Sequence, residues 1–348
     1  MEHQLFHTDG NPRNSEGSFI KLKSGRIMFA YSGYYGDDSF DDCPANICAV
    51  TSDDGGVSWS DPFILIKNDA LNLMSVSLLR LQDDRIALMY IRKDSVTGYP
   101  DVDCRPFIRF SSDEAETWSD PIDVVDLPHL YLVVNNDRLV QLKNGRIIFP
   151  GSLHRYVHTP SRLADGIGLF FYSDDGGLSW KQSKGVCYPD ECMPQGLMEP
   201  GIIELENGKL MCWFRTTMKC QYKSFSYDNG ETWSHPVPAP EFMAPSSPLS
   251  MKRNPATGEL VAIWNDHHPL RSVNPQDNSM GYRTPLVMAK SFDNGVSWQD
   301  HTAIENSPIH GYAYTAIMFE QDKIFLAYCC GNKLTCKRML QDLKIKII

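Results

Sequence analysis

The 348-residue sequence has no surplus of basic residues. Aspartate and glutamate number 43 against 33 lysines and arginines, which gives a formal net charge of -10 at pH 7. A chain with this balance repels a phosphate backbone, and no dense basic block offsets the repulsion. The composition therefore argues against a nucleic-acid partner.

Long apolar runs are missing as well. No stretch of about 18 apolar residues occurs that would span a bilayer as a helix. The first ten residues, Met1 to Gly10, contain acidic and polar side chains and lack the apolar core of a secretory signal. We therefore expect no membrane partner and a cytoplasmic location.

Metal-binding patterns are also absent. The ten cysteines form no Cys-x-x-Cys pair and no zinc-ribbon spacing, so we expect most of them to be buried apolar fillers in a reducing compartment. The acidic run at 53–56 resembles the start of a calcium loop, but Phe63 and Ile64 stand where an EF-hand loop needs its last glutamate. We predict no metal site and no cofactor.

What the sequence does contain is a repeat. The pattern Ser-x-Asp-x-Gly-x-Thr/Ser-Trp, called the Asp-box below, recurs with a period of about 60 residues. In such a turn the aspartate accepts backbone N–H bonds, the glycine supplies a positive φ and the tryptophan packs beneath. The Asp-box is therefore a structural signature. Its five copies lie at 52–59, 111–118 (with Ala115 in place of glycine), 173–180, 226–233 and 291–298.

A second period supports the same unit. A pair of short apolar strands joined by a tight turn, such as Ser24-Gly25 or Asn144-Gly145, recurs six times, beginning with Phe19 to Tyr31. We predict an all-β fold, a six-bladed β-propeller with Asp-box turns, in which residues 1–348 form a single domain. The sixth hairpin has no Asp-box after it, so we expect the N-terminal segment to supply the outer strand of that blade and close the ring.

Three arginines fall where the strands and loops of a propeller reach its central axis. Arg13 precedes the first hairpin, Arg215 ends the hairpin of the fourth unit, and Arg283 opens the strand that leads to the fifth Asp-box. Planar guanidinium groups match a carboxylate in bidentate geometry, so their convergence predicts a carboxylate-bearing small molecule as ligand. The alternative is that each arginine pairs with an acidic side chain, and Glu16 is close enough to pair with Arg13.

These features together resemble the sialidase (neuraminidase) superfamily of exo-acting glycoside hydrolases over nearly the whole chain. The resemblance rests on the five Asp-boxes, the three arginines, Glu199-Pro200 ahead of a Gly-Lys-Leu hairpin, and the segment Tyr-Thr-Ala-Ile at 314–317. It implies that Arg13, Arg215 and Arg283 hold the sialic acid carboxylate. It also implies that Tyr314, paired with Glu199, is the nucleophile, and that an aspartate near the first Asp-box is the acid/base.

The chemistry of such a site suits these residue types. Sialic acid carries its carboxylate on the anomeric carbon and would repel a carboxylate nucleophile, whereas a neutral tyrosine avoids that repulsion. Glu199 would take the phenol proton of Tyr314, and the acid/base would protonate the leaving oxygen and then activate water, which retains the configuration.

Two of the assignments have competitors. The loop between the first hairpin and its Asp-box contains four aspartates, of which we choose Asp41, eleven residues before Ser52, over Asp42. The cluster is otherwise a solvated acidic loop. Tyr312 competes with Tyr314, and strand alternation predicts that both side chains lie on the same face.

Other polar side chains are candidates for contacts with substrate hydroxyl or N-acyl groups. Most of them also fit a turn or an ion pair between blades, which we regard as the stronger interpretation, whereas the alternative for Tyr312 is a core or stacking tyrosine and that for Asp42 a solvated acidic loop. The candidates are Asp42, Asp103, Arg105, Asn136, Gln221, Tyr222 and Tyr312, with Trp264 and His267-His268 in a similar position.

One departure from the family pattern keeps three functions open. Sialidases commonly carry their first arginine in an aromatic-Arg-Ile-Pro segment, whereas Arg13 lies in Asn-Pro-Arg-Asn-Ser-Glu-Gly. The first function is a retaining exo-sialidase acting on sialylated glycans. The second is a hydrolase or lyase for another acidic glycan, of uronate or deaminated sialic acid, with an incomplete arginine triad and His154 or His310 near the acid. The third is a non-catalytic glycan-binding propeller without a tyrosine–glutamate contact.

Overall fold

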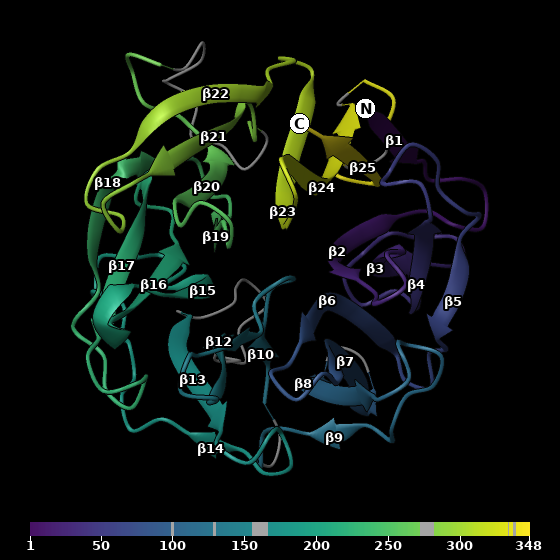
Figure 1. Cartoon of the computed structure of the whole chain (residues 1–348), viewed down its shortest axis with the longest axis horizontal. Coiled ribbons are helices and arrows are strands. Elements are labelled where there is room, and N and C mark those ends of the chain that lie inside the picture. Colours follow the sequence, from purple (N-terminus) through teal and green to yellow (C-terminus); the bar gives the residue numbers. More distant parts are fainter. Residues whose placement is uncertain (99–100, 128–129, 155–165, 272–281, 333, 337–338) are drawn as a thin grey trace.

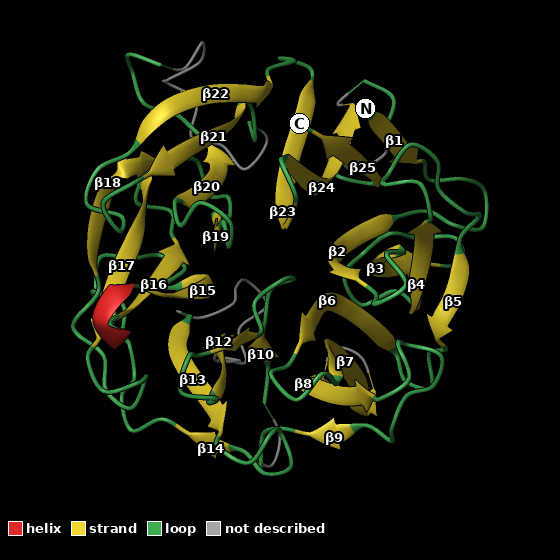
Figure 2. Cartoon of the chain, viewed as in Figure 1, coloured by secondary structure: helices red, strands yellow, loops and turns green. Residues whose placement is uncertain are grey.

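Six antiparallel sheets are arranged radially around a central axis (Figures 1 and 2). The computed structural model describes residues 1–98, 101–127, 130–154, 166–271, 282–332, 334–336 and 339–348. The only helical element in these ranges is the 3-10 turn η1 (Glu206–Gly208). Across the same ranges no helix is long and apolar enough to cross a membrane.

Each sheet forms one blade, with its first strand nearest the axis (Figure 1). Blade 1 contains β2 (Asn14–Lys21), β3 (Ile27–Tyr34), β4 (Ala45–Ser52) and β5 (Phe63–Ile66). Blade 2 contains β6 (Asn72–Arg80), β7 (Ile86–Gly98), β8 (Asp101–Ser111) and β9 (Ile122–Asp123). Blade 3 contains β10 (Leu132–Val133), β11 (Val140–Gln141), β12 (Ile147–Leu153), β13 (Ile167–Ser173) and β14 (Lys181–Gln182).

The second half of the ring follows the same plan. Blade 4 contains β15 (Met198–Glu204), β16 (Leu210–Arg215), β17 (Cys220–Ser226) and β18 (Val237–Met243). Blade 5 contains β19 (Ser250–Arg253), β20 (Leu260–Asn265), β21 (Leu286–Ser291) and β22 (Gln299–Glu305). Blade 6 contains β23 (His310–Glu320), β24 (Lys323–Asn332), β25 (Asp342–Ile347) and, as its outermost strand, β1 (Glu2–Leu5).

The two ends of the chain close the ring in one blade. Strand β1 pairs antiparallel with β25, from Glu2 opposite Lys346 to Leu5 opposite Leu343. Figure 1 shows both termini in this blade. The prediction of a six-bladed propeller whose last blade takes its outer strand from the N-terminal segment is therefore confirmed.

The Asp-box turns connect the third and fourth strands of their blades. In the first box, Asp54 Oδ1 accepts hydrogen bonds from Ser52 Oγ at 2.8 Å and from the backbone N–H of Ser58 at 2.9 Å. Hydrogen bonding, chiefly from the Ser58 hydroxyl group, lowers the pKa of Asp54 to about 2. In the second box Ala115 adopts a positive φ of 70, so the turn keeps its shape without the glycine.

The apolar core is divided among the blade interfaces. Each of the six buried clusters draws its side chains from two neighbouring blades, so burial of apolar surface joins every blade to the next. Of the ten cysteines, all of which are free, only five are buried. The expectation that most cysteines are buried therefore overestimated their number, because several cysteines lie at strand ends and in loops.

The innermost strands share a local irregularity. Strands β2, β6, β15 and β23 each contain a register shift of the kind that a β-bulge makes. A non-glycine residue with positive φ lies at each shift: Glu16 (48), Ser75 (60), Glu199 (44) and Tyr314 (60). Because a bulge bends its strand and changes the direction of a side chain, equivalent positions of four blades present polar groups near the axis.

Candidate active site

A cavity of about 400 Å³ opens where the inner strands meet. Its wall includes residues of β10, β15 and β23, three innermost strands that lie around the centre in Figure 1, with β23 across from the other two. Five of the six residues to which the sequence analysis gave a principal role line this cavity. They are Asp41, Glu199, Arg215, Arg283 and Tyr314.

Tyr314 and Glu199 are in direct contact. The Tyr314 hydroxyl group donates a hydrogen bond to Glu199 Oε1 at 3.1 Å, and Arg215 Nη1 donates to the same oxygen at 2.7 Å. Burial, with the Glu199 carboxylate as the second cause, raises the pKa of Tyr314 well above its ordinary value. The phenol is therefore protonated at neutral pH, and its O–H already points toward the carboxylate oxygen that would accept the proton.

Arg283 lies against the same tyrosine. Its guanidinium carbon is 5.3 Å from the centre of the Tyr314 ring, and its Nη2 donates to the carbonyl group of Ser246 at 3.3 Å. Its Nε has no hydrogen-bond partner among the residues that the structure describes. Arg283 thus brings a buried positive charge with unused donor capacity to the cavity.

Arg13 is engaged by two carboxylates. Its Nη1 lies 2.5 Å from Asp41 Oδ1, and its Nη2 lies 3.5 Å from Glu16 Oε1. The Arg13 side chain is 12% exposed and Asp41 is 66% exposed. Arg13 lines a neighbouring cavity of about 420 Å³ that shares Asp41, Arg283 and Tyr314 with the first. All three arginines therefore border the same group of residues, and Arg13 has the acidic partners that the sequence analysis gave as its alternative.

Asp42 has a different environment from Asp41. Its Oδ1 lies 3.0 Å from Nζ of Lys93, a lysine whose side chain is only 3% exposed, and Asp42 does not line the cavity. Lys93 also donates to the backbone carbonyl of Asp41 at 2.9 Å. The lysine therefore fixes this loop and leaves the Asp41 side chain directed toward Arg13.

Tyr312 is separated from Tyr314, so the prediction that both side chains share one face was wrong. The register shift between Ala313 and Ala316 in β23 breaks the strand alternation. Tyr312 is 3% exposed and packs in the interface between blades 5 and 6, whereas Tyr314 packs with the interface between blades 6 and 1. Only Tyr314 lines the cavity.

The other predicted contacts do not line the cavity. Asp103 and Arg105 form an ion pair at 2.6 Å, Gln221 donates to the carbonyl group of Ser247 at 2.8 Å, and Tyr222 lies in the apolar core. Trp264 is fully buried in the core as well. These side chains contact the scaffold and not the cavity, and the ion pair joins two residues of β8 and not two blades.

Asn136 does not line the cavity either, but its side chain contacts the backbone of a residue that does. Its Nδ2 donates to the backbone carbonyl of Tyr314 at 3.1 Å and to that of Gly17 at 2.7 Å. Asn136 is 1% exposed and lies between β10 and β11 of blade 3. It holds the bulges of blades 6 and 1 in place.

Several lining residues were not chosen from the sequence. Tyr131, Val133, Gln195 and Met198 belong to no pattern that marks a site, whereas the sequence indicates His154 only for the second function. Burial lowers the pKa of His154 to about 4, so its imidazole is neutral at pH 7. His310 does not line the cavity, and its Nδ1 lies 2.8 Å from the Ser307 hydroxyl group.

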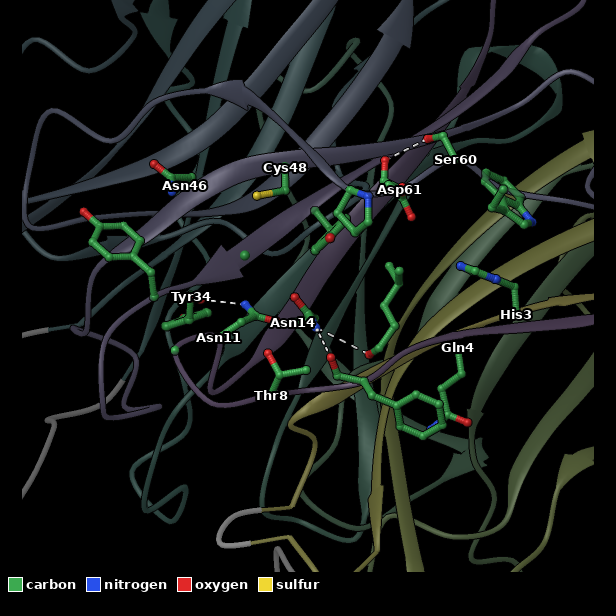
Figure 3. A pocket seen from close by; sticks show the side chains of 18 residues that line it. His3, Gln4, Thr8, Asn11, Asn14, Tyr34, Asn46, Cys48, Ser60 and Asp61 are labelled. Atoms are coloured by element: carbon green, nitrogen blue, oxygen red, sulfur yellow. Dashed lines mark hydrogen bonds between the residues drawn. The ribbon is translucent and has the colours of Figure 1, made fainter.

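Two other features of the structure are of the kind that can form a binding site, a metal-type group of side chains and a second cavity. His7, Cys336 and Asp342 place ligand-type atoms within 4.8 Å of one another, the one such metal-type group found among the described residues. A cavity of about 600 Å³ between blades 6 and 1 is larger than the first (Figure 3). Its lining contains no arginine and Asp61 as its only acidic side chain, so it lacks the groups that bind a carboxylate. The chemically equipped cavity is the axial one.

Six blades with Asp-box turns, around a cavity lined by arginines, a glutamate and a tyrosine, define a sialidase-like propeller. The family comparison agrees with this class. The chain belongs to the sialidase/BNR-repeat superfamily, because the model of the BNR repeat-like domain matches residues 26–326.

Individual relatives are distant. An anhydrosialidase of Macrobdella decora is 32% identical over 139 residues, which cover 38% of the chain and 16% of that protein. A sialidase of Vibrio cholerae is 26% identical over 188 residues, which cover 47% of the chain and 22% of that protein. The chain thus matches less than a quarter of the length of these two relatives.

Solved structures show the same fold. A protein of unknown function from Dyadobacter fermentans has a TM-score of 0.77 at 16% identity, with 99% of this chain and 97% of that chain covered. The leech intramolecular trans-sialidase in complex with 2,7-anhydro-Neu5Ac has a TM-score of 0.73 at 16% identity, with 99% and 69% covered.

Proposed function

We propose that the protein is a retaining exo-α-sialidase, which removes terminal sialic acids from glycoconjugates or oligosaccharides. The observation that carries the proposal is the hydrogen bond of 3.1 Å between the Tyr314 hydroxyl group and Glu199 Oε1. A buried tyrosine with a raised pKa is a poor nucleophile unless a base removes its proton during attack. The hydrogen bond supports Glu199 as that base.

In the first step the Tyr314 oxygen attacks the anomeric carbon, and its proton passes to Glu199. The bond from the anomeric carbon to the glycosidic oxygen breaks, and Asp41 gives its proton to that oxygen. The products of this step are the free leaving alcohol and a covalent tyrosyl–sugar intermediate. Arg215 and Arg283 hold the substrate carboxylate close to Tyr314 by charge-assisted hydrogen bonds.

In the second step Asp41 removes a proton from water, and the hydroxide attacks the anomeric carbon. The bond to the Tyr314 oxygen breaks, and the proton on Glu199 returns to the phenolate. Two displacements at the same carbon give net retention of configuration.

Arg13 has a double role in this scheme. Its ion pair with Asp41, at 2.5 Å, favours the ionised aspartate before substrate binds. A substrate carboxylate that takes the place of Asp41 on Arg13 releases the aspartate toward the glycosidic oxygen and removes the charge that opposes its protonation. Binding of the substrate would therefore prepare the acid.

The direct test is turnover of a methylumbelliferyl α-sialoside by the pure wild-type protein and by Tyr314→Phe and Glu199→Ala. We expect turnover by the wild type and a loss of about 100-fold or more in kcat for both variants. Tyr312→Phe is the matched control, because Tyr312 lies two residues away in the same strand and does not line the cavity. We expect Tyr312→Phe to keep nearly full activity.

Hydrolysis must be separated from transfer, because two of the similar proteins are named an anhydrosialidase and an intramolecular trans-sialidase. Mass spectrometry of the sugar product distinguishes the two reactions. Hydrolysis in H₂¹⁸O gives a sialic acid that carries the label, whereas intramolecular transfer gives an unlabelled product that is lighter by one water. We expect the labelled acid.

A second candidate is hydrolysis of another acidic sugar, of the uronate or deaminated sialic acid type. Two observations favour it: Arg13 is already paired with Asp41 and Glu16, and His154 lines the cavity. Aryl glycosides of these sugars, assayed beside the sialoside, decide between the candidates. Turnover of none of them would leave a non-catalytic glycan-binding propeller.

A further inference from the structure

Three side chains with metal-ligand atoms meet in blade 6, the blade that contains both termini (Figure 1). His7 follows β1, Cys336 lies in the connection from β24 to β25, and Asp342 is the first residue of β25. A ring nitrogen of His7, Sγ of Cys336 and a carboxylate oxygen of Asp342 all lie within 4.8 Å of one another. The set is therefore assembled from the two ends of the chain.

The end of a strand pair brings the first two ligands together. The pairing of β1 with β25 stops at Leu5 and Leu343. Just beyond it, Oδ1 of Asp342 accepts a hydrogen bond from the backbone N–H of His7 at 2.7 Å and lies 2.6 Å from His7 Nδ1. Both hydrogen bonds described for this carboxylate are on Oδ1, which leaves Oδ2 for another partner.

The Asp342 carboxylate is buried next to a group whose charge depends on pH. The Asp342 side chain is 8% exposed, and within the described ranges its one ion-pair partner is His7, whose side chain is 34% exposed. An imidazole is positively charged only when it is protonated. A divalent cation bound by the neutral imidazole would compensate the carboxylate at neutral pH, where a buried charge without a partner is costly.

We propose that His7, Cys336 and Asp342 form a binding site for one zinc ion. Imidazole nitrogen, thiolate sulfur and carboxylate oxygen are the donors that zinc takes in proteins, whereas calcium and magnesium take oxygen ligands. Ligand atoms around one tetrahedral zinc are about 3–4 Å apart, because zinc–ligand bonds are roughly 2.0–2.3 Å long. The separations in this group, from 2.6 Å between His7 Nδ1 and Asp342 Oδ1 to at most 4.8 Å, bracket that spacing.

The role of such an ion is structural. It links the segment after β1 to the connection between β24 and β25, and His7 and Asp342 are 335 residues apart in the sequence. A link between distant segments stabilises the fold by restricting the unfolded chain. Three protein ligands leave the fourth position of the zinc to water. The prediction of no metal site was drawn from cysteine spacings, which cannot show ligands that the two ends of the chain supply.

The test is zinc binding by the pure full-length protein, after a chelator has removed bound metal and has itself been dialysed away. Titration against a chromophoric zinc indicator gives the stoichiometry and Kd. Cobalt(II) in place of zinc gives a spectroscopic signature, because a cobalt–thiolate bond adds a charge-transfer band in the near ultraviolet. We expect one zinc per chain in the wild type. Cys336→Ser should remove the cobalt band and raise Kd at least about tenfold, and His7→Gln should raise Kd by a similar factor.

Cys192→Ser is the matched control. Cys192 is exposed and close in sequence to Asp190, which pairs with His235 at 3.0 Å. The same three residue types thus occur here, but they are not a metal-type group among the residues that the structure describes. Cys192→Ser should keep the wild-type Kd and the cobalt band.

Thermal unfolding is a second readout. At a zinc concentration of about 100 times Kd, the wild type should gain about 2–5 °C in Tm and Cys336→Ser less than about 1 °C. Unfolding without metal shows whether Cys336→Ser is folded. If it is not, His7→Gln at a partly exposed position gives the same comparison.

A wild type that binds no zinc in stoichiometric amount would overturn the proposal. So would a folded Cys336→Ser that keeps the cobalt band and the Kd, or a Cys192→Ser that loses both, since zinc would then bind at other thiols. None of the three proposed ligands lines the axial cavity, and no step of the test measures glycosidase activity. The zinc site and the proposed function therefore stand or fall separately.

Discussion

Arg13 Nη1 and Asp41 Oδ1 lie 2.5 Å apart, so the arginine proposed to bind the substrate carboxylate is paired with the aspartate proposed to act as the acid. The pair joins substrate binding to protonation of the leaving group. If Asp41 has this role, its replacement should lower kcat/KM most for substrates whose leaving group must be protonated.

We predict that Asp41→Asn lowers kcat/KM for sialyllactose by about 100-fold or more, because lactose must leave with a proton. Methylumbelliferone leaves as a stabilised phenolate, so the loss with the aryl sialoside should be below about tenfold. Steady-state kinetics with both substrates measures the ratio. Asp42→Asn, which disturbs the loop through Lys93, should affect the two substrates equally. A larger ratio for Asp42→Asn than for Asp41→Asn would transfer the acid role to Asp42.

His154 should make the fold sensitive to mild acid. Burial lowers its pKa in the folded state to about 4, below its value in an unfolded chain. Between these two values the unfolded chain binds more protons, so the contribution of neutral His154 to stability is fully present near pH 7 and is lost as the pH falls toward 4.

The measurement is urea-induced unfolding at pH 7.5 and at pH 5.0. We predict that His154→Asn reduces the pH-dependent loss in the free energy of unfolding by roughly 1–3 kcal/mol. His235 is the control, since it is exposed and pairs with Asp190 at 3.0 Å, and His235→Asn should change the loss little. The same loss in the wild type and in His154→Asn would show that His154 is not buried as a neutral group.

The repeat made the fold predictable from the sequence. The Asp-boxes and the hairpins are local patterns, and each fixes a turn between strands that are close in the chain. Two periods of the same length left six blades as the simplest count. The missing outer strand of the sixth blade then pointed to the N-terminal segment, which forms β1.

The site was harder to predict from the sequence than the fold, because no sequence pattern marks the bulges of the inner strands. Regular alternation put Tyr312 and Tyr314 on one face, whereas the positive φ of Tyr314 in the bulge separates them. The partner of Asp42, the buried Lys93, is about 50 residues away in another blade. Met339 and Gln341 come from a C-terminal segment that carries no motif and reaches the site only through the closure of the ring.

Asn136 should be a positioning residue for the nucleophile. Its side-chain amide donates to the backbone carbonyls of Gly17 and Tyr314, so Asn136→Ala leaves two buried acceptors without this donor. We predict a loss of about 1–3 kcal/mol in the free energy of unfolding and a several-fold lower kcat with little change in KM. Denaturant unfolding and steady-state kinetics test the two parts.

Asn135 is the matched control for this variant. It is equally buried, at 2% exposure, but its Nδ2 has no partner within the described part of the chain. Asn135→Ala should therefore lose less stability and retain kcat. Equal effects of the two variants would mean that the amide bond to the Tyr314 carbonyl does not hold the bulge.

The closure of the ring depends on a glycine of the first Asp-box. Gly56 has a φ of 87, and a Cβ atom at this position would lie 2.2 Å from Cδ1 of Ile347 and 2.7 Å from the Phe325 ring. Both contacts belong to blade 6, so Gly56→Ala would push the first blade away from the last. Gly25 has a similar φ of 92 but no atom within 4 Å of its added Cβ. Gly25→Ala thus reports the backbone strain alone, about 1–2 kcal/mol.

We predict that Gly56→Ala lowers the free energy of unfolding by about 1–3 kcal/mol more than Gly25→Ala does, because overpacking adds to the strain. Thermal unfolding of the two variants at one protein concentration gives the comparison. Equal losses would mean that the interface between blades 1 and 6 adjusts to the methyl group, and that closure does not depend on close packing at Gly56.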